Sequence, residues 1–151
     1  MQADTAWSRI HATAMLSGLG LLLWTDSLSP LLLLAGISFT GYLAVNMRRL
    51  LALRPLGGYA NWVTISRLAL LIAAGGLQSG WHPYRSFVAF LLVIVTDGID
   101  GYLARKYQQQ SELGATLDIE TDALLCLVLA AIHYQNGFAG GWVLLAGSLR
   151  Y

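Results

Sequence analysis

Acidic residues are concentrated in one part of this chain, where their surroundings are otherwise apolar. Six of the eight Asp and Glu residues lie between positions 97 and 122, in or beside two strongly hydrophobic stretches. A carboxylate in an apolar environment costs several kcal/mol unless it is paired or coordinated. The cluster therefore indicates a functional site rather than a solvated surface.

The first half of the cluster has helical spacing. Asp97, Asp100, Gly101 and Ala104 occupy positions i, i+3, i+4 and i+7, which share one face of a helix. Arg105 adjoins that face and can pair with a phosphate group.

The second half repeats the pattern on the next helix. Gly114, Asp118 and Asp122 are spaced by four residues, again on one face. The intervening loop, about residues 107–111, is short, and short loops join antiparallel neighbours. The four aspartates are therefore expected to reach the same depth and to face one another.

Converging carboxylates suggest bound cations. Four of them would repel one another unless positive charge lay between them, and oxygen donors suit magnesium or manganese better than zinc. Two such ions could clamp a diphosphate and assist an in-line displacement. An ion or proton relay is the alternative chemistry for intramembrane aspartates. Glu112 and Glu120 are expected outside the site, as a helix-terminal charge or a partner for a neighbouring helix.

The composition places these helices in a membrane. Hydrophobic residues make up 56% of the 151 residues, and only 11% are charged, against about 25% in a typical soluble domain. The net charge of +1 disfavours a nucleic-acid partner. The single cysteine, Cys126, excludes an intrachain disulfide and is predicted to be a small core residue.

The predicted fold is all-α, a polytopic transmembrane bundle of about five to six helices, the last of them cut short. A membrane span needs about 20 residues, and about 17 at the short end. The stretches with helical character are 9–24, 29–46, 61–78, 83–106, 112–134 and a last one from about 140. The second to fifth are long enough, and the first is marginal.

The basic residues predict an orientation. With a cytoplasmic N-terminus, most of them fall on the cytoplasmic side, as the positive-inside rule requires: Arg9, Arg48, Arg49, Arg54, Arg105 and Lys106. Only Arg85 falls outside. The active site of an integral inner or plasma membrane protein would then face the cytoplasm. Residues 47–59 are expected to form an interfacial helix, unless their arginines are only topological anchors.

These residues resemble a known family. The segment DGIDGYLARKYQQQSELGATLDIETD reads D-x-x-D-G-x-x-A-R, eight residues, then G-x-x-x-D-x-x-x-D. It resembles the signature of the CDP-alcohol phosphatidyltransferases (class I) at every defining position. NWVTISR, residues 61–67, is similar to an N-x-x-T-x-x-R segment on the family's first membrane helix.

The resemblance implies a role for each matching residue. Asp97, Asp100, Asp118 and Asp122 would bind two Mg²⁺ or Mn²⁺ ions, and Asp122 would also be the general base. The residues implied to contact the CDP part are Asn61, Thr64, Gly101, Ala104, Arg105, Ser111 and Gly114, with Arg67 as an assisting residue. The implied reaction moves a phosphatidyl group from a CDP-alcohol lipid, such as CDP-diacylglycerol, to a small alcohol in phospholipid biosynthesis and releases CMP.

The resemblance covers roughly residues 45–151. We therefore expect an additional helix pair at 1–46 and a family domain at 47–151 that is incomplete at its C-terminal end, since family members usually have six helices. A fragment, or a partner chain that completes the fold, would explain this. Glycine pairs spaced by four residues, Gly76/Gly80 and Gly137/Gly141, suggest close helix packing and a homodimer.

The acceptor and the activity stay open at this point. The sequence LDIETDALL lacks the D-P-x-x-D-K pattern usual in phosphatidylglycerophosphate synthases, and nothing marks an inositol phosphate or serine acceptor. The alternatives are a non-enzymatic cation-handling membrane protein, an intramembrane prenyltransferase and an inactive truncated relative.

Overall fold

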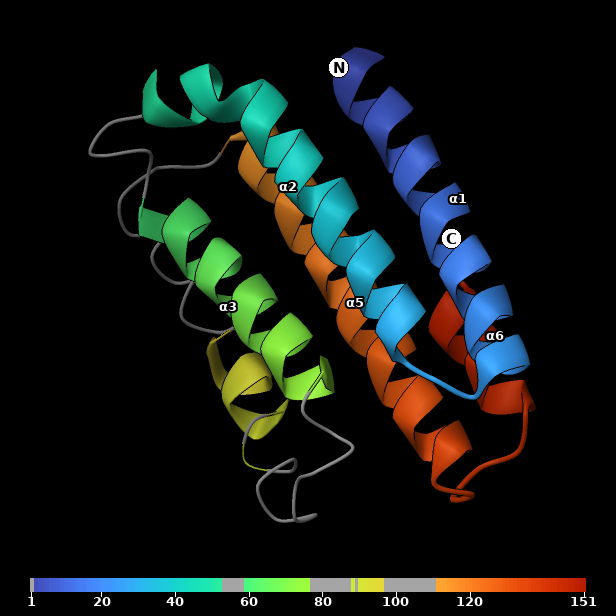
Figure 1. Ribbon diagram of the computed structural model, residues 1–151. Coiled ribbons are helices and arrows are strands. Elements are labelled where there is room, and N and C mark those ends of the chain that lie inside the picture. The colour runs from blue at the N-terminus through green and yellow to red at the C-terminus, as the bar shows by residue number, and fades with distance from the viewer. Residues whose placement is uncertain (1, 53–58, 77–87, 89, 97–110) are drawn as a thin grey trace. The chain divides into compact units, whose positions relative to one another are not determined.

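The computed structural model describes residues 2–52, 59–76, 88, 90–96 and 111–151 (Figure 1). Their helices are α1 (Gln2–Thr25), α2 (Ser29–Ala52), α3 (Tyr59–Gly76), α5 (Glu112–Gln135) and α6 (Trp142–Ser148). Residue 88 and residues 90–96 are also helical. No strand occurs in these ranges, which confirms the all-α prediction for this part of the chain.

One of the described helices, α2, is both long and apolar enough to cross a membrane, with a mean hydropathy of 1.5. The predicted number of spans is therefore not confirmed. The helix α5 has the same length of 24 residues but carries four acidic side chains. The residues that suggest a function are thus among those that make this helix less apolar.

The chain packs as two compact units. The first comprises residues 1–40 and 122–151, and the second comprises residues 41–121. Both α2 and α5 contribute a segment to each unit. The expected boundary near residue 46 was drawn from sequence resemblance, and it stays a prediction.

The first unit is built on an antiparallel pair, α1 and the beginning of α2. Gly18 of α1 approaches Leu31, whereas the earlier residue His11 bonds to the later residue Ser38 across the same pair. Near its C-terminal end, α5 is tied to the turn between α1 and α2, because the Gln135 side chain donates to the Asp26 carbonyl at 2.8 Å.

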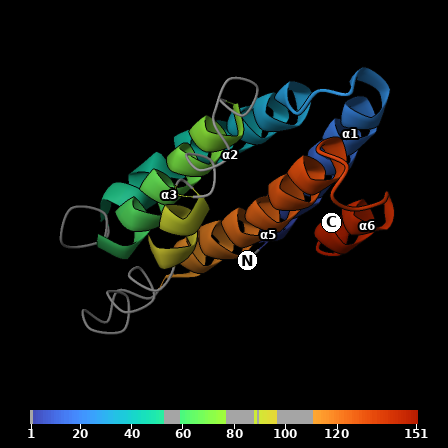
Figure 2. The ribbon, with the colours of Figure 1, turned by 90° about the horizontal axis from the view of Figure 1, so that it is seen from below.

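The short helix α6 packs on α5 through a glycine (Figure 2). A Cβ atom at Gly147 would lie 2.7 Å from the Cβ of Ala130 and 3.1 Å from the Cα of Leu127. Only a residue without a side chain permits this close approach.

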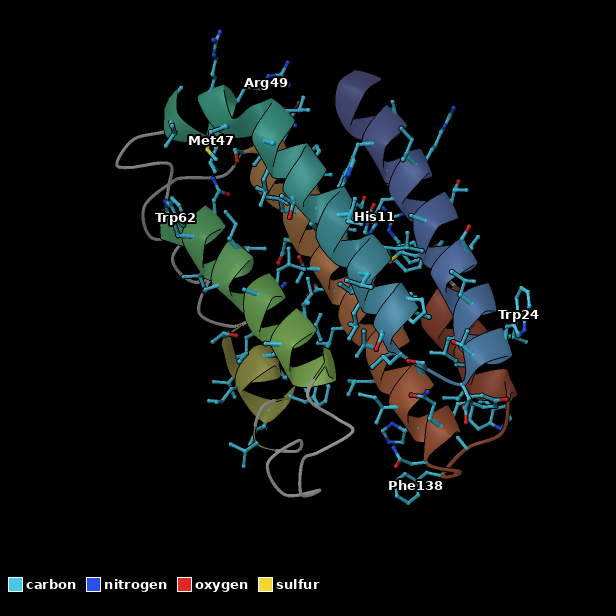
Figure 3. All side chains as sticks on the ribbon, viewed as in Figure 1. His11, Trp24, Met47, Arg49, Trp62 and Phe138 are labelled. Carbon is cyan, nitrogen blue, oxygen red and sulfur yellow. The ribbon has the colours of Figure 1, made fainter. Side chains whose placement is uncertain are left out.

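A polar and aromatic cluster joins α1 to α2 in the same unit (Figure 3). His11 is fully buried, and its Nδ1 lies 2.9 Å from the Ser38 hydroxyl. Its ring stacks on Trp7 at 5.0 Å and meets Phe39 edge-on at 4.7 Å. The Trp7 indole donates to the Ser38 carbonyl at 3.2 Å. These contacts fix the pairing of two helices that lie before the family-like region.

Residues 47–52 are continuous with α2, because neither glycine nor proline interrupts the helix between Asn46 and Ala52. Residues 53–58, the middle of the expected interfacial helix, lie outside the described residues, so that helix stays a prediction. One expectation was wrong. Cys126 is exposed rather than part of the core, because it lies on the outer face of α5.

We predict that Gly18→Ala destabilises the protein. Its new Cβ would lie 2.9 Å from the Cα and Cδ1 of Leu31, and the backbone atom cannot move aside. Overpacking of this kind costs about 1–3 kcal/mol. The matched control is Gly20→Ala on the same helix, where a Cβ meets nothing within 4 Å. Thermal unfolding in detergent should show a lower midpoint for Gly18→Ala only. Equal midpoints for the two variants would contradict the close approach of α1 and α2.

Candidate functional site

An ion pair joins α3 to α5 in the second unit. Nη2 of Arg67 donates to Oδ1 of Asp118 at 2.7 Å. The arginine side chain is 1% exposed, whereas the aspartate side chain is 42% exposed. The guanidinium is therefore enclosed by protein, while the carboxylate is open to a ligand.

The arginine ends a buried polar stripe on α3. Asn61, Thr64 and Arg67 follow one another at intervals of three residues, and all three are buried. The stripe matches the three positions that sequence reasoning assigned to the nucleotide site. Burial against protein is a different environment from an open nucleotide pocket, so their contact with CDP stays a prediction.

A glycine lets this stripe approach α5. A Cβ at Gly114 would collide with Oδ1 of Asn61, and it would lie 3.0 Å from the Ser111 hydroxyl. Asn61 thus faces Gly114, and six residues later Arg67 faces Asp118. Because both contacts occur in the same order along the two helices, α3 and α5 run parallel here (Figure 1). When successive helices cross a membrane in alternating directions, the first and the third also run parallel.

Ser111 has a structural role at the start of α5. Its hydroxyl accepts the N–H of Gly114 at 3.0 Å, and its carbonyl accepts the N–H of Ala115 at 2.9 Å. These are the bonds of a helix N-cap. A hydroxyl that accepts one bond can still donate another, so the predicted contact of Ser111 with CDP stays a prediction.

Asp122 lies one turn after Asp118 on α5, and both residues are partly exposed. Their carboxylates share one face of the helix and offer the oxygen donors that Mg²⁺ and Mn²⁺ prefer. The chemistry of this pair therefore fits a hard divalent cation. In the part of the chain that the structure describes, no three His, Cys, Asp or Glu side chains gather to hold a metal.

The other half of the predicted site lies outside the described residues. This half comprises Asp97, Asp100, Gly101, Ala104 and Arg105. Their convergence with the aspartates of α5 stays a prediction.

Sequence reasoning missed the partner of Arg67. It assigned the arginine an assisting role at the nucleotide, although an arginine within an apolar helix generally needs an anionic partner. The aspartates of the next acidic helix were the natural candidates. Glu120 was expected to face away from Asp118 and Asp122. Its side chain is buried at 1% exposure, and the direction in which it faces stays a prediction.

Comparisons with known proteins cover the same region. A sequence model of the family described as CDP-alcohol phosphatidyltransferase matches residues 58–151. A protein of Sodalis glossinidius, named CDP-diacylglycerol–glycerol-3-phosphate 3-phosphatidyltransferase, is 35% identical over 82 residues. A protein of the same name from Yersinia pestis (strain Pestoides F) is also 35% identical over 82 residues. One from Escherichia coli (strain K12) is 37% identical over 59 residues.

The matches are partial on both sides. For the first two relatives the alignment covers 50% of this chain and 45% of the relative, and for the third it covers 37% and 32%. The chain thus spans about half the length of the curated relatives it matches. No solved structure gives a significant match.

We predict that Ser111→Ala lowers the stability of the protein, because the first turn of α5 loses its cap. Loss of an N-cap side chain costs about 0.5–2 kcal/mol. Ser111→Asn keeps a capping oxygen and should unfold near the wild-type temperature. The measurement is the midpoint of thermal unfolding for the three proteins in one detergent. An Asn variant as unstable as the Ala variant would show that capping is not the role of Ser111.

Proposed function

Because this chain belongs to the CDP-alcohol phosphatidyltransferase family, we propose that it transfers a phosphatidyl group from CDP-diacylglycerol to the hydroxyl of a small alcohol and releases CMP. The observation that carries the proposal is the complete motif of residues 97–122, which lies inside the span matched by the family. Prenyltransferases also use aspartate pairs, but without this A-R and glycine spacing.

Glycerol 3-phosphate is the first acceptor to consider. The relatives carry it in their names, and they are similar to this chain over half its length. Ile119 and Ala123 follow the last two aspartates, where phosphatidylglycerophosphate synthases usually have proline and lysine. This difference is the reason to test other small alcohols beside it.

The four aspartates would have two roles, metal binding and proton acceptance. Asp118 and Asp122, together with Asp97 and Asp100, would hold two Mg²⁺ or Mn²⁺ ions. When bound, these ions would neutralise the diphosphate of the donor. Asp122 would accept the proton of the acceptor hydroxyl. The hydroxyl oxygen then attacks the β-phosphorus, the bond from that phosphorus to the bridging oxygen breaks, and CMP leaves with the electron pair.

The remaining residues would bind and orient the donor. Arg105 and the space beside Gly101 and Gly114 suit a phosphate and a nucleotide that approach the backbone closely. A donor with acyl chains would enter from the lipid with its head group toward water. This requires a site near the membrane surface, and the distribution of basic residues favours the cytoplasmic side. A homodimer is part of the same proposal.

The proposal is tested by measuring CMP release from CDP-diacylglycerol by the purified chain in detergent with Mn²⁺. The acceptors are glycerol 3-phosphate, inositol phosphate, inositol, serine and choline, each in a separate reaction. We expect one acceptor to stimulate release and excess chelator to abolish it. Release that continues unchanged in chelator would remove the two-metal mechanism, and no release with any acceptor would count against the proposed reaction.

We predict that Asp122→Asn lowers the rate of CMP release by at least about 100-fold, the usual contribution of a general base. Asp26→Asn is the control, because it also removes one carboxylate. Asp26 lies in the turn between α1 and α2 with φ of 50°, a conformation that asparagine tolerates well. The control should keep wild-type activity. Comparable rates in the two variants would refute the role assigned to Asp122.

A further inference from the structure

We propose that Arg67 is a positioning residue that holds the carboxylate of Asp118 in the orientation needed to bind a divalent cation. The inference rests on the proposed function, in which Asp118 is one of the cation ligands. It assigns Asn61 and Arg67 of α3 to the support of α5 rather than to direct contact with the nucleotide.

The two partners of the ion pair differ in freedom. Arg67 is 1% exposed, so its guanidinium has a fixed place between α3 and α5. Asp118 is 42% exposed and would otherwise turn freely about its side-chain bonds. The 2.7 Å bond to Oδ1 removes this freedom. A carboxylate has about four lone-pair sites, so one bond to arginine leaves capacity for a cation.

The position of the guanidinium is itself set by close packing. Asn61 reaches α5 only because Gly114 has no side chain, and this contact lies six residues before Arg67 on α3. Ser111 caps α5 three residues before the same glycine. The contact and the cap therefore fix the register in which Arg67 meets Asp118.

Arginine suits this role better than lysine. Its guanidinium stays charged when buried and presents donors in a rigid plane, whereas a buried lysine loses its charge more readily. Conserved hydrogen bonds to ligating carboxylates are a general feature of metal sites, and their removal costs about 10–100-fold in metal affinity.

The positive charge of Arg67 also opposes a second cation nearby, so two effects compete. Charge repulsion would make removal of Arg67 strengthen metal binding, and loss of orientation would make removal weaken it. Because Asp118 is 42% exposed, solvent screens the repulsion, while it does nothing to restore the orientation. We therefore expect the orientation effect to dominate.

The test is a titration of the purified chain with Mn²⁺, followed by the electron paramagnetic resonance signal of the free ion. Arg67→Met should weaken Mn²⁺ binding about 10–100-fold. Arg67→Lys keeps a nitrogen donor but lacks the rigid plane of donors, and it should recover part of the affinity. Arg49→Met, which removes an exposed arginine near the end of α2, is the control and should bind like wild type.

Kinetics separate positioning from nucleotide contact. At saturating Mn²⁺, the KM of Arg67→Met for CDP-diacylglycerol should stay within about twofold of wild type. The Mn²⁺ concentration that gives the half-maximal rate should rise by the factor seen in the titration.

Unchanged or tighter Mn²⁺ binding by Arg67→Met overturns the inference, as does a raised KM for CDP-diacylglycerol with normal Mn²⁺ binding. If Arg67→Met does not fold, the Arg67→Lys titration decides alone. Wild-type Mn²⁺ affinity in Arg67→Lys would show that the planar guanidinium is not needed. A wild-type chain that binds no Mn²⁺ would instead refute the metal site of the proposed function.

Discussion

A buried guanidinium in an apolar helix is the constraint around which the second unit is arranged. Arg67 cannot be enclosed by α3 and α5 without an anion, and Asp118 supplies it at 2.7 Å. Removing one partner of a fully buried pair typically costs about 3–5 kcal/mol, and the cost here is smaller because Asp118 is 42% exposed. Exchanging both for apolar residues is often tolerated, so stability alone is a weak reason for the pair. The pair lies beside a predicted cation site, so orienting a cation ligand is a second reason for its presence.

The neighbouring residues serve the same contact. A glycine at position 114 brings α3 close to α5, and the cap at Ser111 defines where α5 begins. The carboxylates of Asp118 and Asp122 then follow on one face of a helix whose start is fixed. Sites built on helices hold their ligands more precisely than sites on loops. A phosphoryl transfer that depends on positioning and charge neutralisation needs this kind of scaffold.

The first unit is held together by different kinds of contact. Its two N-terminal helices lie before the residues matched by the family and are joined by a buried histidine, aromatic rings and a close glycine contact. The bond from Gln135 to the turn at Asp26 ties this pair to the end of α5. The helix pair is thus packed against a helix of the family region rather than attached by a free linker.

Several features followed directly from local sequence patterns. The start of α5 was predicted at about Glu112, where the structure also places it. The family was recognisable because its motif fixes eight positions within residues 97–122. The end of α2 was placed too early, at about Asn46, because no glycine or proline interrupts the helix between that residue and Ala52. Cys126 was misjudged because an apolar run does not show which of its residues face outward.

The sequence by itself determined the helical class, the apolar character and the aspartates that share each helix face. These properties depend on residue type and on the period of the helix, which are local. Only the tertiary structure decided that Arg67 pairs with Asp118 and that Asn61 lies on Gly114. Both contacts join residues about 50 positions apart, at 67 and 118 and at 61 and 114. The distance between two helices is set by the side chains that pack between them, and no periodicity along one helix contains that information.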